Sequence, residues 1–293
     1  MAAAQSPVTP LVRFDAAALA EVFGRKPMLV EHELLGERLL QLEALADLAG
    51  DLPQTLEFVE HHRGDAGELV PGGGESAPRL AVSGVDVVRS IETNQCRMSL
   101  RHIELVPRYA ELMDRVLDGV APLIPERDGR MRQREGFVFV NAPNSITPLH
   151  ADPEHNFLLQ TRGTKTVRIG TFADQSRLDL DLERQYGGGH HYLTTMPDEL
   201  VEYALRPGIG LYIPPHVAHM VENGDEASVS LSVTFRTAAT KRGENVYRFN
   251  ARLRKLRLQP HPPGDSKVVD VAKAATVRAW KRARSLASGL DQR

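Results

Sequence analysis

Residues 144–165 read NSITPLHADPEHNFLLQTRGTK, and this stretch decides both the fold class and the candidate site. It holds His150-Ala151-Asp152 between two segments with the composition of β-strands. Residues two apart in an extended segment point to the same side, so the His150 imidazole and the Asp152 carboxylate would converge on one point. Two histidines and one carboxylate can occupy one face of an octahedral iron(II) and leave three positions open. A His-x-Asp triplet alone is also compatible with an ordinary surface loop after Pro148.

Short strand-like segments surround this stretch. The sequence predicts strands at residues 137–140, 155–161, 165–169, 211–213 and 229–235, and Arg162-Gly163 suits a tight hairpin. In residues 229–235 apolar side chains alternate with serine and threonine, which is typical of a strand with one polar and one apolar face. Several short strands in succession favour a β-sandwich or barrel, in which a ligand site lies near the mouth.

Helices flank this predicted β core. The spacing of apolar residues predicts helices at residues 16–23, 33–48, 109–120 and 268–286, a strand at 26–30 and a surface loop at 64–76. We therefore expect a mainly β protein with flanking helices. An N-terminal α/β region over residues 1–130 would pack on a β-barrel core over residues 131–237, and a basic, helical region would follow over residues 238–293.

The composition excludes several classes of protein. The 293 residues carry a net charge of −2, which gives no general attraction to nucleic acid or acidic membranes. Cys96 is the single cysteine, so an intrachain disulfide and a thiolate zinc site are both excluded. Residues 1–10 lack the features of a secretory signal, and no apolar run approaches the roughly 18–20 residues of a membrane helix. We therefore expect a soluble cytoplasmic protein with no membrane contact.

Two further positions complete the candidate site. His216 and His219 both follow a predicted strand that ends at Pro214-Pro215, and either could be the second histidine. Lys165 shares strand parity with apolar residues, so its ammonium group would point to an apolar interior, where a buried cation requires an anion. The alternative for Lys165 is a solvated side chain on an edge strand.

The whole stretch resembles the JmjC, or cupin-like, oxygenases, and in particular the asparaginyl hydroxylase that inhibits hypoxia-inducible factor. That family has a T-P-x-H-x-D-x-x-x-N core followed by a Q-x-x-G-x-K segment. Its positions are matched here, without insertion or deletion, by Thr147, Pro148, His150, Asp152, Asn156, Gln160, Gly163 and Lys165. Residues 208–214 resemble the family's G-D-x-L-Y-I-P strand, and the last metal histidine of the family comes five places later, which implies His219.

The resemblance implies a fold and a chemistry. The fold is a double-stranded β-helix, the metal is iron(II), and its ligands are His150, Asp152 and His219. Within the cosubstrate site the resemblance implies that Lys165 and Thr147 bind the far carboxylate of 2-oxoglutarate and that Asn156 lies beside this cosubstrate. Thr234 stands where the family has an asparagine, which leaves its role open.

The implied activity is that of an iron(II)- and 2-oxoglutarate-dependent dioxygenase. It would use O2 to hydroxylate an amino-acid side chain, free or in a peptide or protein, or a related small molecule, and release succinate and CO2. Alternatives are a metal-binding cupin that does not use 2-oxoglutarate, and a non-catalytic regulatory or interaction protein on the same barrel. The related hydroxylase holds its peptide with tryptophans where this chain has Val217 and Ala218, so a shared substrate is not expected.

Two segments have open interpretations. Residues 168–205 contain Gly187-Gly188-Gly189-His190-His191-Tyr192 and could be a substrate lid or a solvated loop. The pair His190-His191 could indicate a second metal, although a solvated loop is the simpler interpretation. The basic residues after Lys241 could bind nucleic acid or an acidic partner, but few aromatic residues accompany them, which favours a solvated helix face. The C-terminal helices could form a homodimer or pack on the barrel.

Overall fold

The computed structural model describes residues 11–63 and 82–290. The first ten residues, where the sequence predicts no secretory signal, and the surface loop predicted at residues 64–76 lie outside this part. Within the described residues, no helix has the length and hydropathy needed to cross a membrane.

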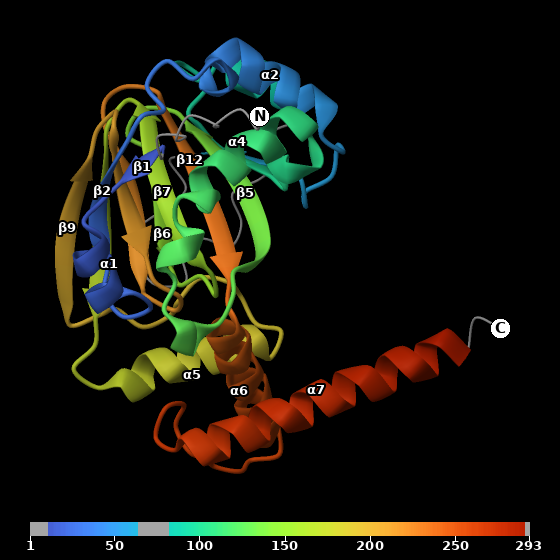
Figure 1. Cartoon of the computed structure of the whole chain (residues 1–293). Coiled ribbons are helices and arrows are strands. Elements are labelled where there is room, and N and C mark those ends of the chain that lie inside the picture. Colours follow the sequence, from blue (N-terminus) through green and yellow to red (C-terminus); the bar gives the residue numbers. More distant parts are fainter. Residues whose placement is uncertain (1–10, 64–81, 291–293) are drawn as a thin grey trace, which may run out of the picture.

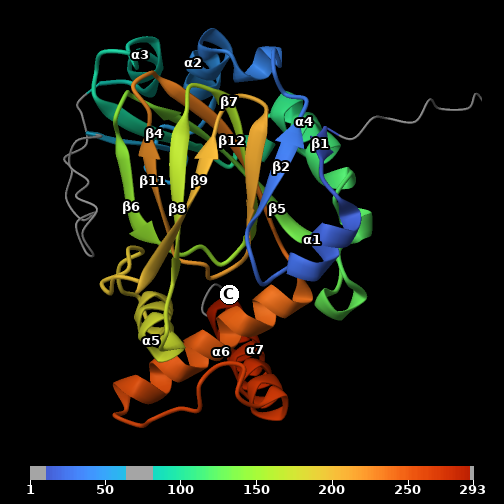
Figure 2. The ribbon, with the colours of Figure 1, turned by 90° about the vertical axis from the view of Figure 1, so that its left-hand side faces the viewer.

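Two antiparallel β-sheets face each other and form the body of the molecule (Figure 1). The small sheet faces the viewer in Figure 2, and its strands lie in the order β6 (Ile146–His150), β11 (His219–Asn223), β8 (Lys165–Thr171) and β9 (Glu199–Leu205). The large sheet has the order β1 (Val12–Arg13), β2 (Met28–His32), β10 (Ile209–Ile213), β7 (His155–Arg162), β12 (Ser228–Arg236), β5 (Arg132–Asn141), β4 (Cys96–Arg101) and β3 (Val59–Arg63).

The strands from β5 to β12 form a double-stranded β-helix. Consecutive strands from β5 to β8 alternate between the two sheets, so that β10, β7, β12 and β5 are neighbours in the large sheet while β6, β11, β8 and β9 make the small one. The N-terminal strands extend this core, because β1 and β2 add to one edge of the large sheet and β4 and β3 to the other. The chain is therefore mainly β around a double-stranded β-helix, as the sequence predicts. The division into three regions stays a prediction.

Helices cover the outside and one end of the sandwich. They are α1 (Ala16–Val22), α2 (Leu42–Asp51), α3 (Gly84–Arg89), α4 (Pro107–Asp118), α5 (Gln175–Tyr186), α6 (Ala238–Lys255) and α7 (Lys267–Leu290). Short 3-10 turns lie at Arg38–Leu40, Ile103–Leu105, Ala121–Leu123 and Glu126–Asp128. Figure 1 shows α5, α6 and α7 below one end of the strands, with α7 projecting away from the body. The strand β6 runs toward α5 (Figure 2), so its last residue, His150, lies at that end.

The alternation in β12 divides the core from the cavity. Val229, Leu231, Val233 and Phe235 are fully buried in the cluster that joins the large sheet to the N-terminal helices. The intervening Ser230, Ser232 and Thr234 are also buried, because their face is turned toward the small sheet. Burying a polar face is costly unless its groups are hydrogen-bonded, and here each of the three hydroxyls donates to an acceptor on a neighbouring strand. Ser232 and Thr234 also line the candidate site.

Three sequence-based expectations are corrected. The turn at Gly163 is tight, with φ +64° at the glycine, but it is not a hairpin: β7 pairs with β10 and β12, and β8 pairs with β9 and β11. One helix over residues 33–48 is wrong at its start, because Gly36 is left-handed (φ +82°) and Gln41 is extended, so α2 begins only at Leu42. Residues 168–205 are mostly regular, because they contain the end of β8, all of α5 and all of β9.

Candidate metal centre

Two neighbouring strands of the small sheet bring the metal-ligand candidates together. His150, at the end of β6, is the direct partner of His219, at the start of β11, and their ring centroids lie 4.1 Å apart. Asp152 follows two residues after His150. Its Oδ2 is 3.8 Å from Nε2 of His150 and 3.8 Å from Nε2 of His219. One ligand atom from each of the three lies within 4.8 Å of the others, which is the size of a single metal site.

Backbone carbonyls hold both imidazoles in the form that binds a metal. Nδ1 of His150 is 2.8 Å from the Pro148 carbonyl oxygen, and Nδ1 of His219 is 2.9 Å from that of Val217. A carbonyl oxygen only accepts, so each Nδ1 carries the proton and each Nε2 keeps a free lone pair. Burial, assisted by the nearby His219, lowers the pKa of His150 to about 3, so this imidazole is neutral at neutral pH.

The charge on Asp152 is stabilised by the same cluster. Burial alone would raise its pKa, but the imidazoles of His150, His191 and His219 hold the pKa below its usual value. Two imidazoles and one carboxylate therefore converge on a common point, and this donor set suits a divalent first-row metal such as iron(II). Across residues 11–63 and 82–290, no other group of three such side chains has this geometry.

His216, the competing histidine, is turned away from this cluster. Its backbone N–H donates to the Asp152 carbonyl oxygen at 2.7 Å, and its Nε2 is 2.8 Å from the Tyr186 hydroxyl on α5. Burial lowers the pKa of His216 to about 4, and its backbone is left-handed with φ +60°. The structure therefore brings His219 to the pair at residues 150 and 152, and leaves His216 to link the metal loop with α5.

A cavity of about 290 Å³ opens from the three metal-ligand candidates into the space between the sheets. It is lined by all four residues assigned to the cosubstrate from the resemblance, namely Thr147, Asn156, Lys165 and Thr234. Two of them already have partners: Asn156 accepts a hydrogen bond from the Ser232 hydroxyl at 2.8 Å, and the Thr234 hydroxyl donates to the Glu135 carbonyl oxygen at 3.1 Å. Thr234 is thus occupied by the neighbouring strand.

Lys165 is a buried cation without a counter-ion. Only 4% of its surface is exposed, and burial alone lowers its pKa from the ordinary value of 10.5 to about 7. In the part of the chain that the structure describes, no carboxylate lies within ion-pairing distance of it. The amide of Asn141 lines the same cavity, and its buried Oδ1 has no hydrogen-bond partner. An anion in the cavity would engage the ammonium group of Lys165, and a hydrogen-bond donor of a ligand would engage the Asn141 oxygen.

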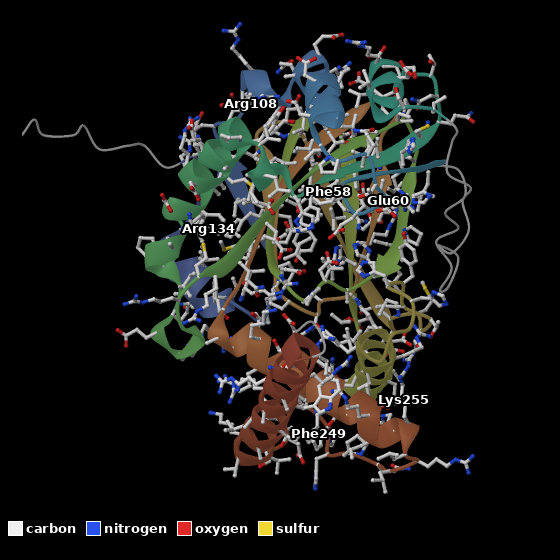
Figure 3. All side chains as sticks on the ribbon, turned by 90° about the vertical axis from the view of Figure 1, so that its right-hand side faces the viewer. Phe58, Glu60, Arg108, Arg134, Phe249 and Lys255 are labelled. Atoms are coloured by element: carbon white, nitrogen blue, oxygen red, sulfur yellow. The ribbon has the colours of Figure 1, made fainter. Side chains whose placement is uncertain are left out.

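The mouth of the cavity contains residues that the sequence analysis missed. Glu60 of β3, in the upper half of Figure 3, forms an ion pair with Arg101 of β4. Arg97, also on β4, donates to the Ile146 carbonyl oxygen at 3.1 Å and to the Tyr192 hydroxyl at 3.4 Å. These residues come from the two edge strands added by the N-terminal region. No strand was predicted there, so sequence reasoning offered no signal for them.

Comparison with known proteins agrees with this site. Residues 130–242 match the family model of the JmjC domain. This segment, which is less than half of the chain, is similar to a JmjC domain. It is 27% identical over 143 residues to JmjC domain-containing protein D of Dictyostelium discoideum, which covers 42% of this chain and 29% of that protein. It is 31% identical over 105 residues to the lysine-specific demethylase JMJ30 of Arabidopsis thaliana, which covers 31% of this chain and 23% of that protein. The matches thus span less than a third of either relative.

The JmjC fold is also shared with solved structures. Escherichia coli ycfD superposes with a TM-score of 0.53 and 16% identity, over 92% of this chain and 67% of that one. A further structure, of YcfD as a ribosomal oxygenase in complex with cobalt and succinic acid, has a TM-score of 0.50 and 16% identity, over 92% and 66%. At this identity the likeness concerns the fold. The more specific resemblance to the asparaginyl hydroxylase stays a prediction, as does the lid.

Proposed function

We propose that this JmjC protein is an iron(II)- and 2-oxoglutarate-dependent oxygenase that hydroxylates an amino-acid side chain, free or in a peptide or protein, or a related small molecule. The observation that carries the proposal is Lys165, a buried ammonium group without a counter-ion in the same cavity as the His-Asp-His cluster. A metal-binding cupin without a dicarboxylate cosubstrate has no use for such a charge, which destabilises the fold.

The residues present fit both groups. His150, Asp152 and His219 would hold iron(II) on one face, with Nε2 and carboxylate lone pairs already converging. Lys165 and the Thr147 hydroxyl would hold the far carboxylate of 2-oxoglutarate, while Asn156 would lie beside it. When bound, the metal and cosubstrate supply the oxidation, in which O2 is consumed and succinate and CO2 are released. The cobalt and succinic acid bound by the YcfD structure are consistent with this pair of sites.

The residues at the mouth of the cavity favour a polar substrate. Glu60, Arg101, Arg97 and Tyr192 place charges of both signs and a hydroxyl around the opening. An amino-acid or peptide substrate carries complementary charges and hydrogen-bonding groups, whereas a purely apolar substrate would leave these groups unsatisfied. Hydroxylation of a methyl group on a modified lysine is a special case of the same chemistry, and the name of the Arabidopsis relative makes it worth including among test substrates.

Turnover of 2-oxoglutarate is the direct test. Purified protein with iron(II) and ascorbate is supplied with 2-oxoglutarate, succinate is measured, and amino acids, peptides and methyl-lysine peptides are screened by mass spectrometry for a gain of one oxygen. Slow succinate formation without substrate and faster formation with one member of the panel are expected. The variants His219→Ala and Lys165→Met should lack both activities, and Lys267→Met, changed on the exposed surface of α7, should behave as wild type. Iron binding without any 2-oxoglutarate turnover would instead favour the cupin alternative.

A further inference from the structure

The two oxygens of Asp152 face different partners. Oδ2 is the oxygen that lies 3.8 Å from both metal-facing Nε2 atoms. The other oxygen, Oδ1, is 3.4 Å from Nε2 of His191, whose ring centroid is 5.3 Å from that of His150. His191 is not one of the three residues whose ligand atoms lie within 4.8 Å of one another. It therefore approaches the carboxylate from outside the metal position.

His191 is held there by the segment that carries it. Tyr192 forms a β-bridge with His150, and the Leu193 N–H donates to the Leu149 carbonyl oxygen at 2.9 Å. Leu193 is 1% exposed, and its side chain anchors the segment in the buried cluster that also contains Leu178 and Leu182 of α5. Thr194 is fixed in turn by two 2.7 Å hydrogen bonds to the Asp181 carboxylate. Contacts to the ligand-bearing strand β6 thus set the position of the His191 ring.

A neighbour on α5 determines which His191 nitrogen carries the proton. Nε2 of the Gln185 amide lies 3.1 Å from Nδ1 of His191. An amide nitrogen only donates, so Nδ1 accepts and the proton of the neutral imidazole is on Nε2. That N–H is the group facing Oδ1 of Asp152. At 3.4 Å the contact is longer than a well-formed hydrogen bond, and contacts of this kind commonly shorten when the site is filled.

We propose that His191 is a positioning residue for the metal carboxylate: it occupies Oδ1 of Asp152, so that only Oδ2 is presented to the metal. The consequence lies in the coordination number. A carboxylate that binds through both oxygens takes two positions on an octahedral metal, and with two histidines it leaves two open instead of three. Three open positions are what a bidentate 2-oxoglutarate and O2 require, so this inference rests on the proposed function.

Manganese(II) provides the test, because it suits the same ligands and is detected directly. Free Mn(II) measured by electron paramagnetic resonance gives the affinity, and relaxation of water protons gives the number of metal-bound waters. The variants are His191→Ala, His191→Gln, which keeps an N–H donor, and His190→Ala, which removes the neighbouring imidazole as a matched control. We expect His191→Ala to bind Mn(II) about tenfold more weakly and with fewer bound waters. His191→Gln should recover most of both properties, and His190→Ala should match wild type.

The possible results distinguish a failure of the role proposed for His191 from a failure of the proposed oxygenase function. Wild-type protein that binds no Mn(II) at all would overturn both. Equal affinity and equal hydration in wild type and His191→Ala would overturn the role of His191 and leave the proposed function standing. Equal losses in His191→Ala and His191→Gln would also overturn it, because the donor would then be irrelevant. Thermal unfolding of the metal-free variants guards against misfolding, and little change is expected because the His191 side chain is 48% exposed.

Discussion

Replacing Lys165 by methionine should make the protein more stable and prevent it from binding its cosubstrate. The side chains have similar length, so the variant removes a buried charge while filling nearly the same volume. The pKa of Lys165 falls from 10.5 to about 7 through burial alone. At about 1.4 kcal/mol per pH unit, this displacement corresponds to about 5 kcal/mol of destabilisation at pH 7. Buried charges exchanged for apolar residues typically recover 1–4 kcal/mol, so we expect a gain of about 2–4 kcal/mol.

The pH dependence identifies the cause of this gain. Between about pH 7 and 10.5 the unfolded chain holds the Lys165 proton and the folded chain does not, so wild-type stability rises with pH in this window. The advantage of Lys165→Met should therefore be largest at pH 7 and below, and should shrink by up to about 1.4 kcal/mol per pH unit above it. The other titratable groups of the cavity are the same in both proteins and cancel in the difference.

Urea unfolding of the metal-free protein from pH 6.5 to 9.5 measures the stability difference, and calorimetry with Mn(II) and 2-oxoglutarate measures binding. Loss of one partner of a buried charge pair costs about 2–5 kcal/mol, so 2-oxoglutarate should bind about 30-fold more weakly or worse. Lys267→Met, on the exposed start of α7, should change neither quantity. A Lys165→Met protein less stable than wild type at pH 7, or an advantage independent of pH, would refute the description of Lys165 as an uncompensated buried cation.

Three further predictions follow from individual contacts. His219→Ala should abolish Mn(II) binding, which a metal titration measures. His216→Ala should still bind Mn(II) but lose roughly 1–3 kcal/mol of stability in urea unfolding, because its hydrogen bond with the Tyr186 hydroxyl is removed. Gly163→Ala should destabilise the protein by more than about 1 kcal/mol, because φ is +64° and a Cβ would lie 2.7 Å from a backbone oxygen; a neutral substitution would mean that this turn rearranges. We also propose a homodimer through the C-terminal helices, where Val268 is 81% and Val271 51% exposed. Light scattering should show a dimer, and the double variant Val268→Asp with Val271→Asp should be a monomer. A monomeric wild-type protein would contradict the proposal.

The two metal-ligand candidates that lie close in sequence could be predicted from backbone geometry, whereas the choice of the third required the structure. His150 and Asp152 are two residues apart on an extended segment, so their convergence follows from backbone geometry. His216 and His219 follow the same strand, and the pattern of residues did not separate them. The structure does so through conformation: His216 has a left-handed backbone and turns toward α5, while His219 pairs with His150 across the sheet.

The fold was predictable where strand periodicity is strong and not where tertiary contacts decide. The alternation in β12 predicted a polar and an apolar face, and both are buried because the two sheets enclose the polar one. The turn at Gly163 was recognised, but a glycine turn cannot tell whether the next strand stays in the same sheet. His191 was interpreted as part of a solvated loop, because its approach to Asp152 depends on a bridge between distant segments, at His150 and Tyr192.

The residues that line the cavity come from two parts of the chain, and only one of them matches the JmjC domain. The residues assigned to metal and cosubstrate, from Thr147 to Thr234, all lie within the segment that matches the JmjC domain. The charged residues at the mouth, Glu60, Arg97 and Arg101, lie outside that segment, on strands that the N-terminal region adds to the edge of the large sheet. The part of the cavity that would hold metal and cosubstrate therefore comes from the segment that matches the JmjC domain, while these three charged residues come from sequence outside it. A search for the substrate should accordingly begin from the chemistry of these three residues, and exchange of Arg97 or Glu60 should alter substrate preference while leaving Mn(II) affinity unchanged.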